Sequence, residues 1–485
     1  MQPNFLPDAM CWISLPIPID TGQNLSREKM EESIKFFSTN LKAASLSFKE
    51  ALLKGQAPDY GLYMPEEIPW LNPREICEFS NLEYYQIAFE VGKRFLRGQI
   101  PEEDLLAIVQ DAYDFEVPLE NVYENKYVMR LDQGPTASFK DFAARMMGRL
   151  MQYYLKQENR ELLILTATSG DTGSAIANAF YGLDNIKVVV LFPIDEVTPR
   201  QRKQMTTLGK NVQIISLDAK FDDCQILVKQ AFADPDLDYL KLSSANSINI
   251  GRLIPQIMYY FYSFARLRKG NPEDSVIFSI PSGNFGDMMG GMLALRMGLP
   301  VRKFIIATNE NDEFPKFVNT GNYNKIVPSK NCLSSAMNVG HPSNLARFVS
   351  LYDGVMDENG FISQKPDMEQ IQNEIYSVSI TDGETKNTIK DAHDKYNLLL
   401  EPHGSVGWAG LQKFLKENPE YDTPEQLCIS LETAHPAKFP EQIREILNLD
   451  PELPPSLEGI EEKKESSDSI ENNYQAFKNY LKEKY

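Results

Sequence analysis

The stretch Glu161–Phe180, ELLILTATSGDTGSAIANAF, places a short apolar run, a glycine-containing loop and an apolar helical pattern in succession. The same order recurs from Ser275 in SVIFSIPSGNFGDMMGGMLALRMG. Further apolar runs of strand length, separated by amphipathic stretches, are KVVVLF from Lys187, VQIISL from Val212, KFIIAT from Lys303 and LCISLET from Leu427. Strands that alternate with helices predict right-handed crossover units and mainly parallel sheets. The predicted fold class is therefore α/β.

Length and composition limit the kinds of protein that the chain can be. Its 485 residues exceed what one ordinary hydrophobic core serves, so two or three sub-domains with a ligand cleft between them are expected. The 49 Lys and Arg against 68 Asp and Glu give a formal charge of −19, which disfavours nucleic acid and anionic lipid as partners. No apolar run is long enough to cross a bilayer, so we expect no membrane partner either.

The cysteines, the histidines and the first residues indicate a cytoplasmic protein without a metal. The five cysteines (Cys11, Cys77, Cys224, Cys332 and Cys428) lie far apart and form no CxxC pair, as is usual for reduced thiols. Four histidines leave little material for a metal centre. The start of the chain, MQPNFLPDAMCWISLPIPID, is broken by prolines and lacks a positive segment, so it does not fit a signal peptide.

The rhythm of the sequence divides the chain into four parts. Residues 1–34 are expected to form a loosely structured extension, and residues 35–125 a mostly helical N-terminal domain. Within that domain, short strands and turns are predicted from Phe36 to Ile68, with helices around residues 82–98 and 102–113. Residues 126–450 carry the α/β pattern in two interleaved sub-domains. Residues 451–485 form a charged tail that ends in a short helical stretch.

Phosphate binding, if present, must use a loop other than the common nucleotide motifs, since GxxxxGK[ST] and GxGxxG are both absent. Ser282–Asp287, SGNFGD, follows a strand and opens a helix, so its backbone N–H groups can converge on a phosphate at the positive end of that helix. Glycine lets the backbone approach a ligand closely. A plain strand-to-helix turn is the competing interpretation.

Ser169–Gly173, SGDTG, has the same place between a strand and a helix and offers hydroxyl and amide donors to a carboxylate or phosphate oxygen. The alternative is an ordinary helix N-cap, with Asp171 or Thr172 accepting backbone N–H bonds.

Gly134–Asp141, GPTASFKD, places a turn, a cap-like Ser138 and Lys140 at the head of a helix rich in methionine and aromatic residues. Lysine forms Schiff bases when burial and nearby cations lower its pKa and free the amine. Most lysines at helix starts are simply solvated, so this segment alone does not decide between a Schiff-base lysine and a solvated one. The methionine and aromatic residues between 142 and 154 are predicted to be core.

The stretch FFSTNLKAASLSFKEALLKGQAPDYGLYMPEEIP, from Phe36, resembles the start of the bacterial and fungal-type threonine synthases. Several later blocks, in this order, resemble those of the same family, so the resemblance runs from about Lys35 to about Leu449. They are SFKDFAARMM, ILTATSGDTGSAIANAFYGL, SLDAKFDDCQ, SSANSINIGRLIPQI, SIPSGNFGD, ATNENDEFP, SSAMNVGHPSNLAR, LEPHGSVGW and TAHPAKFPE. The resemblance implies a tryptophan-synthase-type (fold type II) pyridoxal-phosphate enzyme with two α/β domains. It also implies the conversion of O-phospho-L-homoserine and water to L-threonine and phosphate, the last step of threonine biosynthesis.

The resemblance also assigns residues. Lys140 matches the lysine that binds the cofactor covalently and, once the substrate amine has displaced it, acts as general base at the α-carbon. The implied cofactor contacts are Gly283, Asn284, Phe285, Gly286 and Asp287 around the phosphate, and Thr433 at the pyridine nitrogen. The implied substrate contacts are Thr168, Ser169, Asp171, Thr172, Asn246, Ser247 and Arg252.

Two other interpretations stay open. A phospholyase or dehydratase of the same fold would share Lys140 and the glycine loop but release a 2-oxo acid. A catalytically inactive relative is disfavoured because Lys140, both loops and Thr433 are all retained. For His403 and His435, which lie in the family blocks, an orienting or packing role is preferred to direct proton transfer. A monomer or a homodimer is expected.

Overall fold

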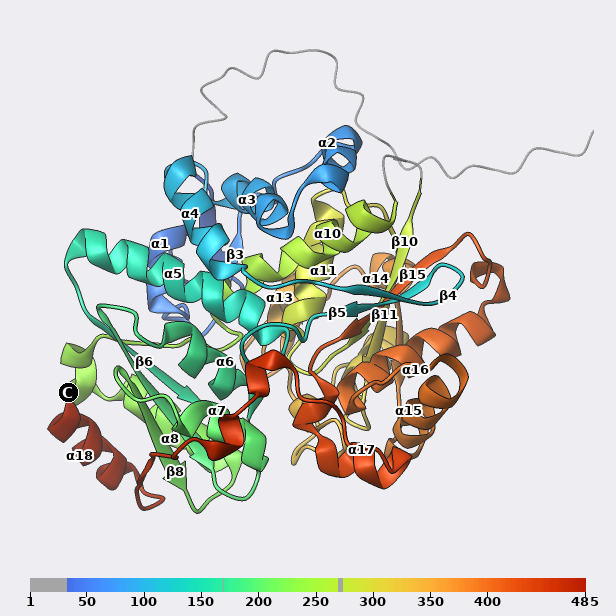
Figure 1. The fold of residues 1–485 in the computed structure, drawn as a ribbon. Helices are drawn as coiled ribbons and strands as arrows, with labels where there is room; N and C mark the ends of the chain where they lie inside the picture. Colours follow the sequence, from blue (N-terminus) through green and yellow to red (C-terminus); the bar gives the residue numbers. More distant parts are fainter. Residues whose placement is uncertain (1–32, 169, 269–273) are drawn as a thin grey trace, which may run out of the picture. The chain divides into compact units, whose positions relative to one another are not determined.

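Two mainly parallel sheets carry the fold in a computed structural model of the chain, which describes residues 33–168, 170–268 and 274–485 (Figure 1). The smaller sheet has the strand order β16 (Asp468–Ser469), β8 (Val212–Leu217), β7 (Ile186–Pro193), β6 (Leu162–Ala167) and β9 (Leu242–Ser243). Each neighbouring pair in it is parallel. The residues of β6 are all buried, as expected for a strand covered on both faces.

The larger sheet has the order β14 (Ile375–Ser379), β11 (Val301–Thr308), β10 (Val276–Pro281), β15 (Leu427–Glu432), β5 (Lys126–Arg130) and β4 (Leu119–Tyr123). Its strands are parallel except for the β4–β5 pair, which is a hairpin. The six apolar runs predicted as strands are thus confirmed as β6, β7, β8, β10, β11 and β15.

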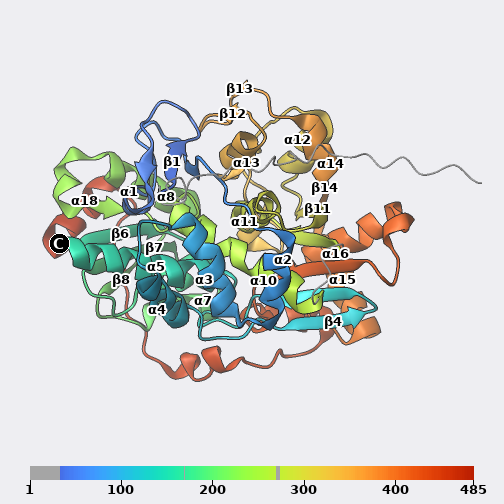
Figure 2. The same ribbon diagram turned by 90° about the horizontal axis from the view of Figure 1, so that it is seen from above.

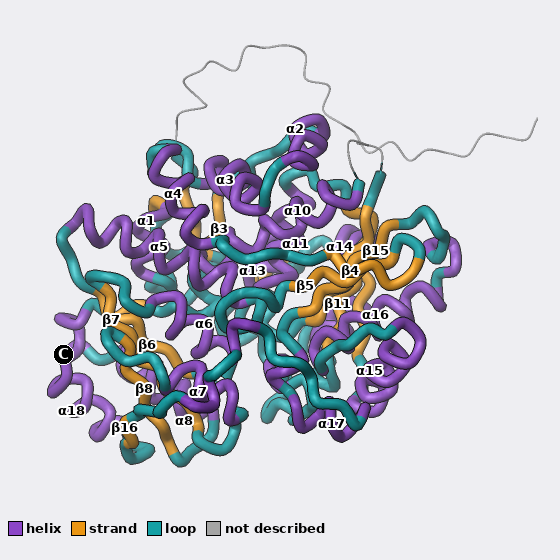
Figure 3. The backbone as a smooth tube through the Cα atoms, in the orientation of Figure 1, coloured by secondary structure: helices purple, strands orange, loops and turns teal. Residues whose placement is uncertain are grey.

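Helices flank the strands of both sheets (Figure 3). Around the smaller sheet they are α5 (Lys140–Glu158), α6 (Asp171–Phe180), α7 (Pro199–Thr206), α8 (Phe221–Ala233) and α18 (Tyr474–Lys484). Around the larger sheet they include α10 (Met258–Leu267), α11 (Gly286–Arg296), α12 (Glu313–Thr320), α13 (Leu345–Leu351), α14 (Met368–Glu374), α15 (Asp382–Tyr396), α16 (Pro402–Glu417) and α17 (Pro440–Leu447). Within the described ranges, none of the helices has the length and apolar character needed to span a membrane.

The first described residues form a small antiparallel sheet and several helices. The sheet consists of β1 (Lys35–Ser38), β2 (Leu46–Ser47) and β3 (Tyr63–Pro65), and the helices are α1 (Phe48–Lys54), α2 (Pro73–Glu78), α3 (Tyr84–Phe95) and α4 (Glu102–Ala112). Helix α3 packs on α10 and α4 packs on α5, as the view from above shows (Figure 2). The two predicted helices are confirmed as α3 and α4.

Helix α1 corrects the prediction of only strands and turns between Phe36 and Ile68. Its start is stabilised by a capping box, in which Ser47 Oγ accepts the N–H of Glu50 and the Glu50 carboxylate accepts the N–H of Ser47. Phe48, Ala51 and Leu52 are buried, so packing adds to this local signal. The pattern of apolar residues over seven positions was too short to reveal the helix.

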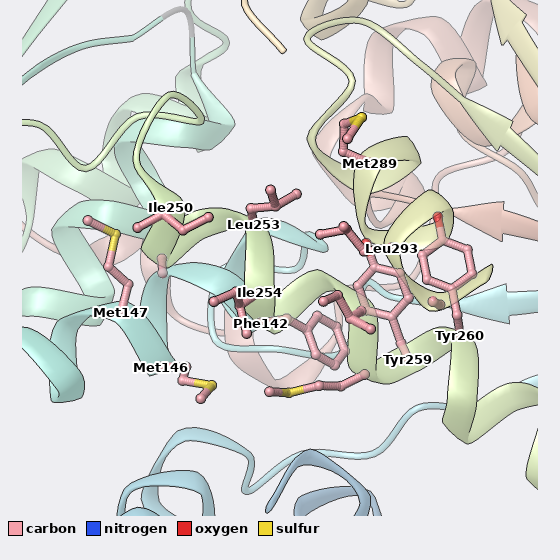
Figure 4. Close-up of a cluster of buried hydrophobic side chains, with 14 of the residues drawn as sticks. Phe142, Met146, Met147, Ile250, Leu253, Ile254, Tyr259, Tyr260, Met289 and Leu293 are labelled. Atoms are coloured by element: carbon pink, nitrogen blue, oxygen red, sulfur yellow. The ribbon is translucent and has the colours of Figure 1, made fainter. Parts of the chain in front are cut away.

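A core of methionine, aromatic and aliphatic side chains lies between the two sheets (Figure 4). Phe142 and Met146 of α5 meet Ile254, Tyr259 of α10 and Leu293 of α11 there. The prediction that the methionine and aromatic side chains of α5 are core is confirmed for Phe142, Met146, Met147, Met151 and Tyr154, whereas Tyr153 is only partly buried. The core therefore fixes the start of α5, two residues before Phe142.

Candidate active site

Lys140 begins α5 and lies beside the carboxyl end of β15. Phe139 N–H donates to the carbonyl of Thr433 at 2.9 Å, and His435 N–H donates to the carbonyl of Ala137 at 3.0 Å. These bonds join the segment that carries Lys140 to the segment that carries Thr433. Among the described residues the Lys140 amine has no hydrogen-bond or ion-pair partner, and its Nζ lies 4.7 Å from the centre of the Phe139 ring.

The turn before Lys140 is held by Asp141 rather than by Ser138. The Asp141 carboxylate accepts the N–H of Thr136 at 2.8 Å and its hydroxyl at 2.6 Å. A Cβ at Gly134 would lie 2.5 Å from Asp141 Oδ2, so the turn requires glycine there. The expectation that Ser138 caps α5 is wrong: the N-cap is Phe139, and the buried Ser138 hydroxyl has no hydrogen-bond partner within the described ranges.

The loop after β6 is shaped by the hydroxyl of Thr168, which accepts the N–H groups of Gly170 and Gly173 at 3.0 and 2.8 Å. Gly170 is the N-cap of α6, with φ of 136°, and the alternative of capping by Asp171 or Thr172 is not observed. Thr172 is partly exposed, and Ser169 lies outside the described residues.

Asp171 is buried in an ion pair with a lysine that the sequence did not single out. Its Oδ1 lies 2.6 Å from Lys438 Nζ and accepts a hydrogen bond from Gln201 Nε2 at 2.8 Å. Burial raises the pKa of Asp171, but the positive charges of Lys438 and Lys140 outweigh burial and hold it well below the usual range. The carboxylate is therefore ionised.

The loop after β10 passes close to residues 336 and 337. A Cβ at Gly283 would lie 2.9 Å from Met337 Cα and 3.0 Å from the carbonyl oxygen of Ala336. Phe285 takes a left-handed backbone with φ of 62° and is buried. Asn284 is exposed, which leaves its side chain accessible at the mouth of the loop.

Asp287 follows Gly286, the first residue of α11, and is almost fully buried. Its Oδ1 accepts the N–H of Met288 at 2.8 Å. Burial raises the pKa of Asp287 from 3.8 to about 6. This aspartate therefore binds a proton under mildly acidic conditions, unlike Asp171.

Residues 246–252 connect the end of β6 with the loop after β10. Asn246 Oδ1 accepts a hydrogen bond from Thr166 at 2.5 Å, and Ser247 Oγ lies 3.3 Å from Ser343 Oγ. Ser343 in turn donates to Asn284 Oδ1 at 3.4 Å from its N–H, so this segment reaches the loop after β10. Arg252 is buried, donates from Nη1 to the carbonyl of Ala245, and keeps an Nε without a hydrogen-bond partner among the described residues.

Three family models together match most of the chain. They are "Threonine synthase N terminus" over residues 35–113, "Pyridoxal-phosphate dependent enzyme" over 117–429 and "Threonine synthase, C-terminal" over 405–481. Threonine synthase of Haemophilus influenzae is 39% identical over 437 residues, which cover 90% of this chain and 96% of that protein. The chain belongs to the threonine synthase family.

Solved structures of threonine synthases share the fold. The PLP-bound enzyme from Brucella melitensis has a TM-score of 0.85 at 36% identity and covers 93% of this chain and 99% of its own. The yeast enzyme has a TM-score of 0.85 at 31% identity, and the match covers 93% of this chain and 98% of the yeast chain. Threonine deaminase isoform 2 from Solanum lycopersicum, 18% identical with a TM-score of 0.52, covers 74% of this chain and 93% of its own and shares the fold alone. The predicted type II pyridoxal-phosphate fold is confirmed, and the cofactor of this threonine synthase family member is pyridoxal phosphate.

The arrangement around Lys140 suits that cofactor. A largely enclosed amine without a partner is free for covalent attachment to an aldehyde. The buried Ser138 hydroxyl beside it is an unused polar group in the described structure. Gly283, in the loop before α11, and Gly286, the first residue of α11, carry no side chain, so a phosphate can approach the N–H groups at the positive end of this helix.

The sequence did not identify some of the polar residues that hold these loops in place. Lys438 and Gln201 hold Asp171, and Arg347 donates to the carbonyls of Ser247 and Ile248 at 3.0 and 2.6 Å. The Lys438 side chain is fully buried and Arg347 is fully buried too, although charged residues are usually exposed. Nothing in the local sequence distinguishes such residues from solvated ones.

The orienting role expected of His403 has direct support. Its Nε2 accepts the N–H of Ala336 at 3.0 Å, so the proton of the neutral ring is on Nδ1, which lies 2.6 Å from Glu401 Oε2. His403 thus links the start of α16 to the segment against which Gly283 packs. His435 Nδ1 accepts the N–H of Ala437 at 3.1 Å, which closes the turn after Thr433.

Proposed function

We propose that this protein is a threonine synthase, converting O-phospho-L-homoserine and water to L-threonine and phosphate as the last step of threonine biosynthesis. One observation carries the proposal from the structural side: the partnerless amine of Lys140 lies at the junction of the segments that end β6, β10 and β15. Ligands of open α/β sheets bind at the carboxyl ends of the strands. Family membership over nearly the whole chain supplies the reaction.

Within this proposal the loop after β10 binds the cofactor phosphate through Gly283, Asn284, Phe285 and Gly286, with Asp287 beside them. The Thr433 hydroxyl would donate a hydrogen bond to the pyridine nitrogen. In support, Thr433 is buried, and its hydroxyl has no hydrogen-bond partner in the part of the chain that the structure describes. When bound, pyridoxal phosphate supplies a conjugated ring that withdraws electrons from the carbon atoms next to the substrate amine.

Lys140 carries the cofactor and then moves protons at its Nζ. Burial lowers the pKa of Lys140, so a larger fraction of the amine is neutral near physiological pH than for an exposed lysine. A neutral amine accepts the proton from the α-carbon of the substrate, and the resulting ammonium returns it later.

The substrate contacts are proposed for Thr168, Ser169, Asp171, Thr172, Asn246, Ser247 and Arg252. Arg252 is the fixed positive charge among them, and its buried Nε has no hydrogen-bond partner among the described residues, which supports a role in binding a substrate oxygen. Burial lowers the Arg252 pKa only to about 10, so its charge is kept at neutral pH. Because the Asp171 carboxylate already pairs with Lys438, the loop after β6 would bind an anion through N–H and hydroxyl groups.

The test is to incubate the purified protein, with its cofactor, with O-phosphohomoserine, to identify the organic product by NMR and to assay phosphate. Threonine in amounts equal to phosphate is expected. Phosphate with 2-oxobutyrate would instead establish the phospholyase alternative, and no phosphate release would reject both activities.

We also propose a cytoplasmic location, which the scattered cysteines support and cell fractionation would check. A monomeric or homodimeric state is proposed as well, with light scattering as its test. The division at residues 34, 125 and 450 is proposed likewise, with limited proteolysis as its test.

A further inference from the structure

The Lys438 ammonium is a fully buried junction of three segments. Its Nζ lies 2.6 Å from Asp171 Oδ1, at the start of α6, and donates to the carbonyl oxygen of Thr136 at 2.8 Å, in the turn before Lys140. Lys438 itself belongs to the turn that follows Thr433. One cation therefore ties together the segments that carry Asp171, Lys140 and Thr433.

Water does not screen this ion pair, because the side chains of Lys438 and Asp171 are 0% and 3% exposed. Charges that are shielded from water interact more strongly than charges at the surface, and each depends on the other for compensation. Gln201 orients the same carboxylate oxygen through its Nε2 at 2.8 Å. The position and the ionised form of Asp171 are thus both fixed.

The charged groups that act on Lys140 come from four different segments. They are Asp171 at the start of α6, Lys438 in the turn after β15, Arg252 in α9 (Ile250–Leu253) and Asp287 in α11. Burial is the largest influence and lowers the Lys140 pKa; Asp171 raises it, Lys438 and Arg252 lower it, and Asp287 raises it. Asp171 and Lys438 therefore act on the same amine with opposite sign.

We propose that Lys438 is a positioning residue that fixes the Asp171 carboxylate, and that the pair jointly sets the charge state of the Lys140 amine. The inference rests on the proposed function, in which Lys140 is the cofactor lysine. Asp171 alone would favour the ammonium form, which neither attacks an aldehyde nor takes a proton from carbon. Lys438 offsets this effect and at the same time holds the carboxylate ready to stabilise the ammonium after proton transfer.

The test compares Lys438→Met, Asp171→Asn and the double variant in two measurements. In the full chain freed of cofactor, Lys140 is labelled with acetic anhydride over a range of pH and quantified by mass spectrometry. In the holoenzyme, the acidic limb of the pH profile of kcat is recorded, because kcat reports groups in the enzyme–substrate complex, in which the substrate amine has displaced Lys140. Loss of Lys438 should move both midpoints up by about 1 pH unit, and loss of Asp171 should move them down by about 1 unit. The double variant should lie near the wild type.

Opposite shifts distinguish this role from a merely structural one, which would lower activity without moving a midpoint. Shifts of the same sign, or no shift, would overturn the proposal. If Lys438→Met does not fold, the midpoints of Asp171→Asn and of the double variant still test the proposal. Lys438→Arg, which keeps the positive charge, should keep the wild-type midpoints. Lys413→Met is the matched control, since Lys413 of α16 pairs with Glu384 of α15 in a partly exposed ion pair. The labelling uses no substrate, so it gives its answer even if no threonine is formed.

Discussion

The loops that follow β6 and β10 have similar sequences, SGDTG and SGNFGD, and each places an aspartate in the first turn of a buried helix. The two aspartates nevertheless differ in charge. Asp171 is held ionised by Lys438 and Lys140, whereas burial without an ion-pair partner among the described residues raises the pKa of Asp287 to about 6. The difference comes from Lys438, which is distant in sequence from both loops, so a loop motif alone does not determine the chemistry of its carboxylate.

The largest effect is expected at Lys140, the amine on which both aspartates act. Lys140→Ala should remove the visible absorbance of the bound cofactor and lower turnover by at least about 10³-fold, since covalent attachment and proton transfer are lost together. The fold should persist, because the Lys140 amine has no hydrogen-bond or ion-pair partner among the described residues and its loss leaves no buried charge unpaired. Absorbance spectra, turnover and circular dichroism check this, and wild-type turnover in the variant would contradict the assignment.

Asp171→Asn should destabilise the protein by about 3–5 kcal/mol at pH 7, because it leaves the buried Lys438 ammonium without a compensating charge. Denaturant unfolding of the full chain measures the change. Asp391→Asn is a useful control: Asp391 also pairs with a lysine, Lys395, but these two side chains are 63% and 60% exposed, and such surface pairs contribute little. If the two substitutions lowered the free energy of unfolding equally, the buried ion pair would contribute no more to stability than an exposed one, and the prediction would be wrong.

Asp287→Asn should stabilise the protein at neutral pH, whereas Asp171→Asn should destabilise it. The raised pKa means that the protonated carboxyl is favoured in the folded state, so its contribution to stability is present below pH 3.8 and is lost as pH rises through about 6. The shift of about two pKa units corresponds to about 3 kcal/mol. Relative to wild type, the free energy of unfolding of the variant should rise by up to this amount between pH 4 and pH 7. A pH-independent difference would show that Asp287 does not titrate as described.

Gly283→Ala should have a smaller effect on stability, about 1–3 kcal/mol, because the added methyl group meets the backbone of Ala336 and Met337. It should also weaken cofactor binding, measured by equilibrium dialysis. Gly286→Ala is the matched substitution, since its methyl group would meet only the end of the Gln256 side chain at 3.2 Å. If Gly286→Ala were the more harmful of the two, the close approach at Gly283 would not be the limiting contact.

Much of the fold could be predicted because its strands are continuous apolar runs such as LLILTA and VIFSIP, whose burial on both faces leaves a strong pattern. Helix α1 could not, since a short helix stabilised by Ser47, Glu50 and packing has little periodicity of its own. The position of Lys140 at the start of a helix could be expected from its neighbours. The unpaired state of its amine could not, because it depends on distant residues.

The contacts that hold the candidate site together are mostly long-range. Ser138 looked like a cap, but the backbone of this segment pairs with Ala434 and Thr433, and Asp141 supplies the local hydrogen bonds. Lys438 looked like any other lysine, although it is among the most buried residues of the protein. Such pairings follow from tertiary structure, and short sequence patterns contain no information on them.

The edge strand β16 has a consequence for biosynthesis. It pairs with β8 and brings Ser216 within 3.2 Å of the carbonyl of Asp468, 252 positions later in the chain, while Phe477 and Leu481 of α18 pack in the core that contains residues of α8. A ribosome makes the other strands of the smaller sheet long before it makes β16, so the edge of β8 stays open during synthesis of the larger sheet. Open strand edges pair readily with other chains. The nascent protein is therefore exposed to aggregation at this edge until β16 has been made, even though all the other strands of both sheets precede β16 in the chain.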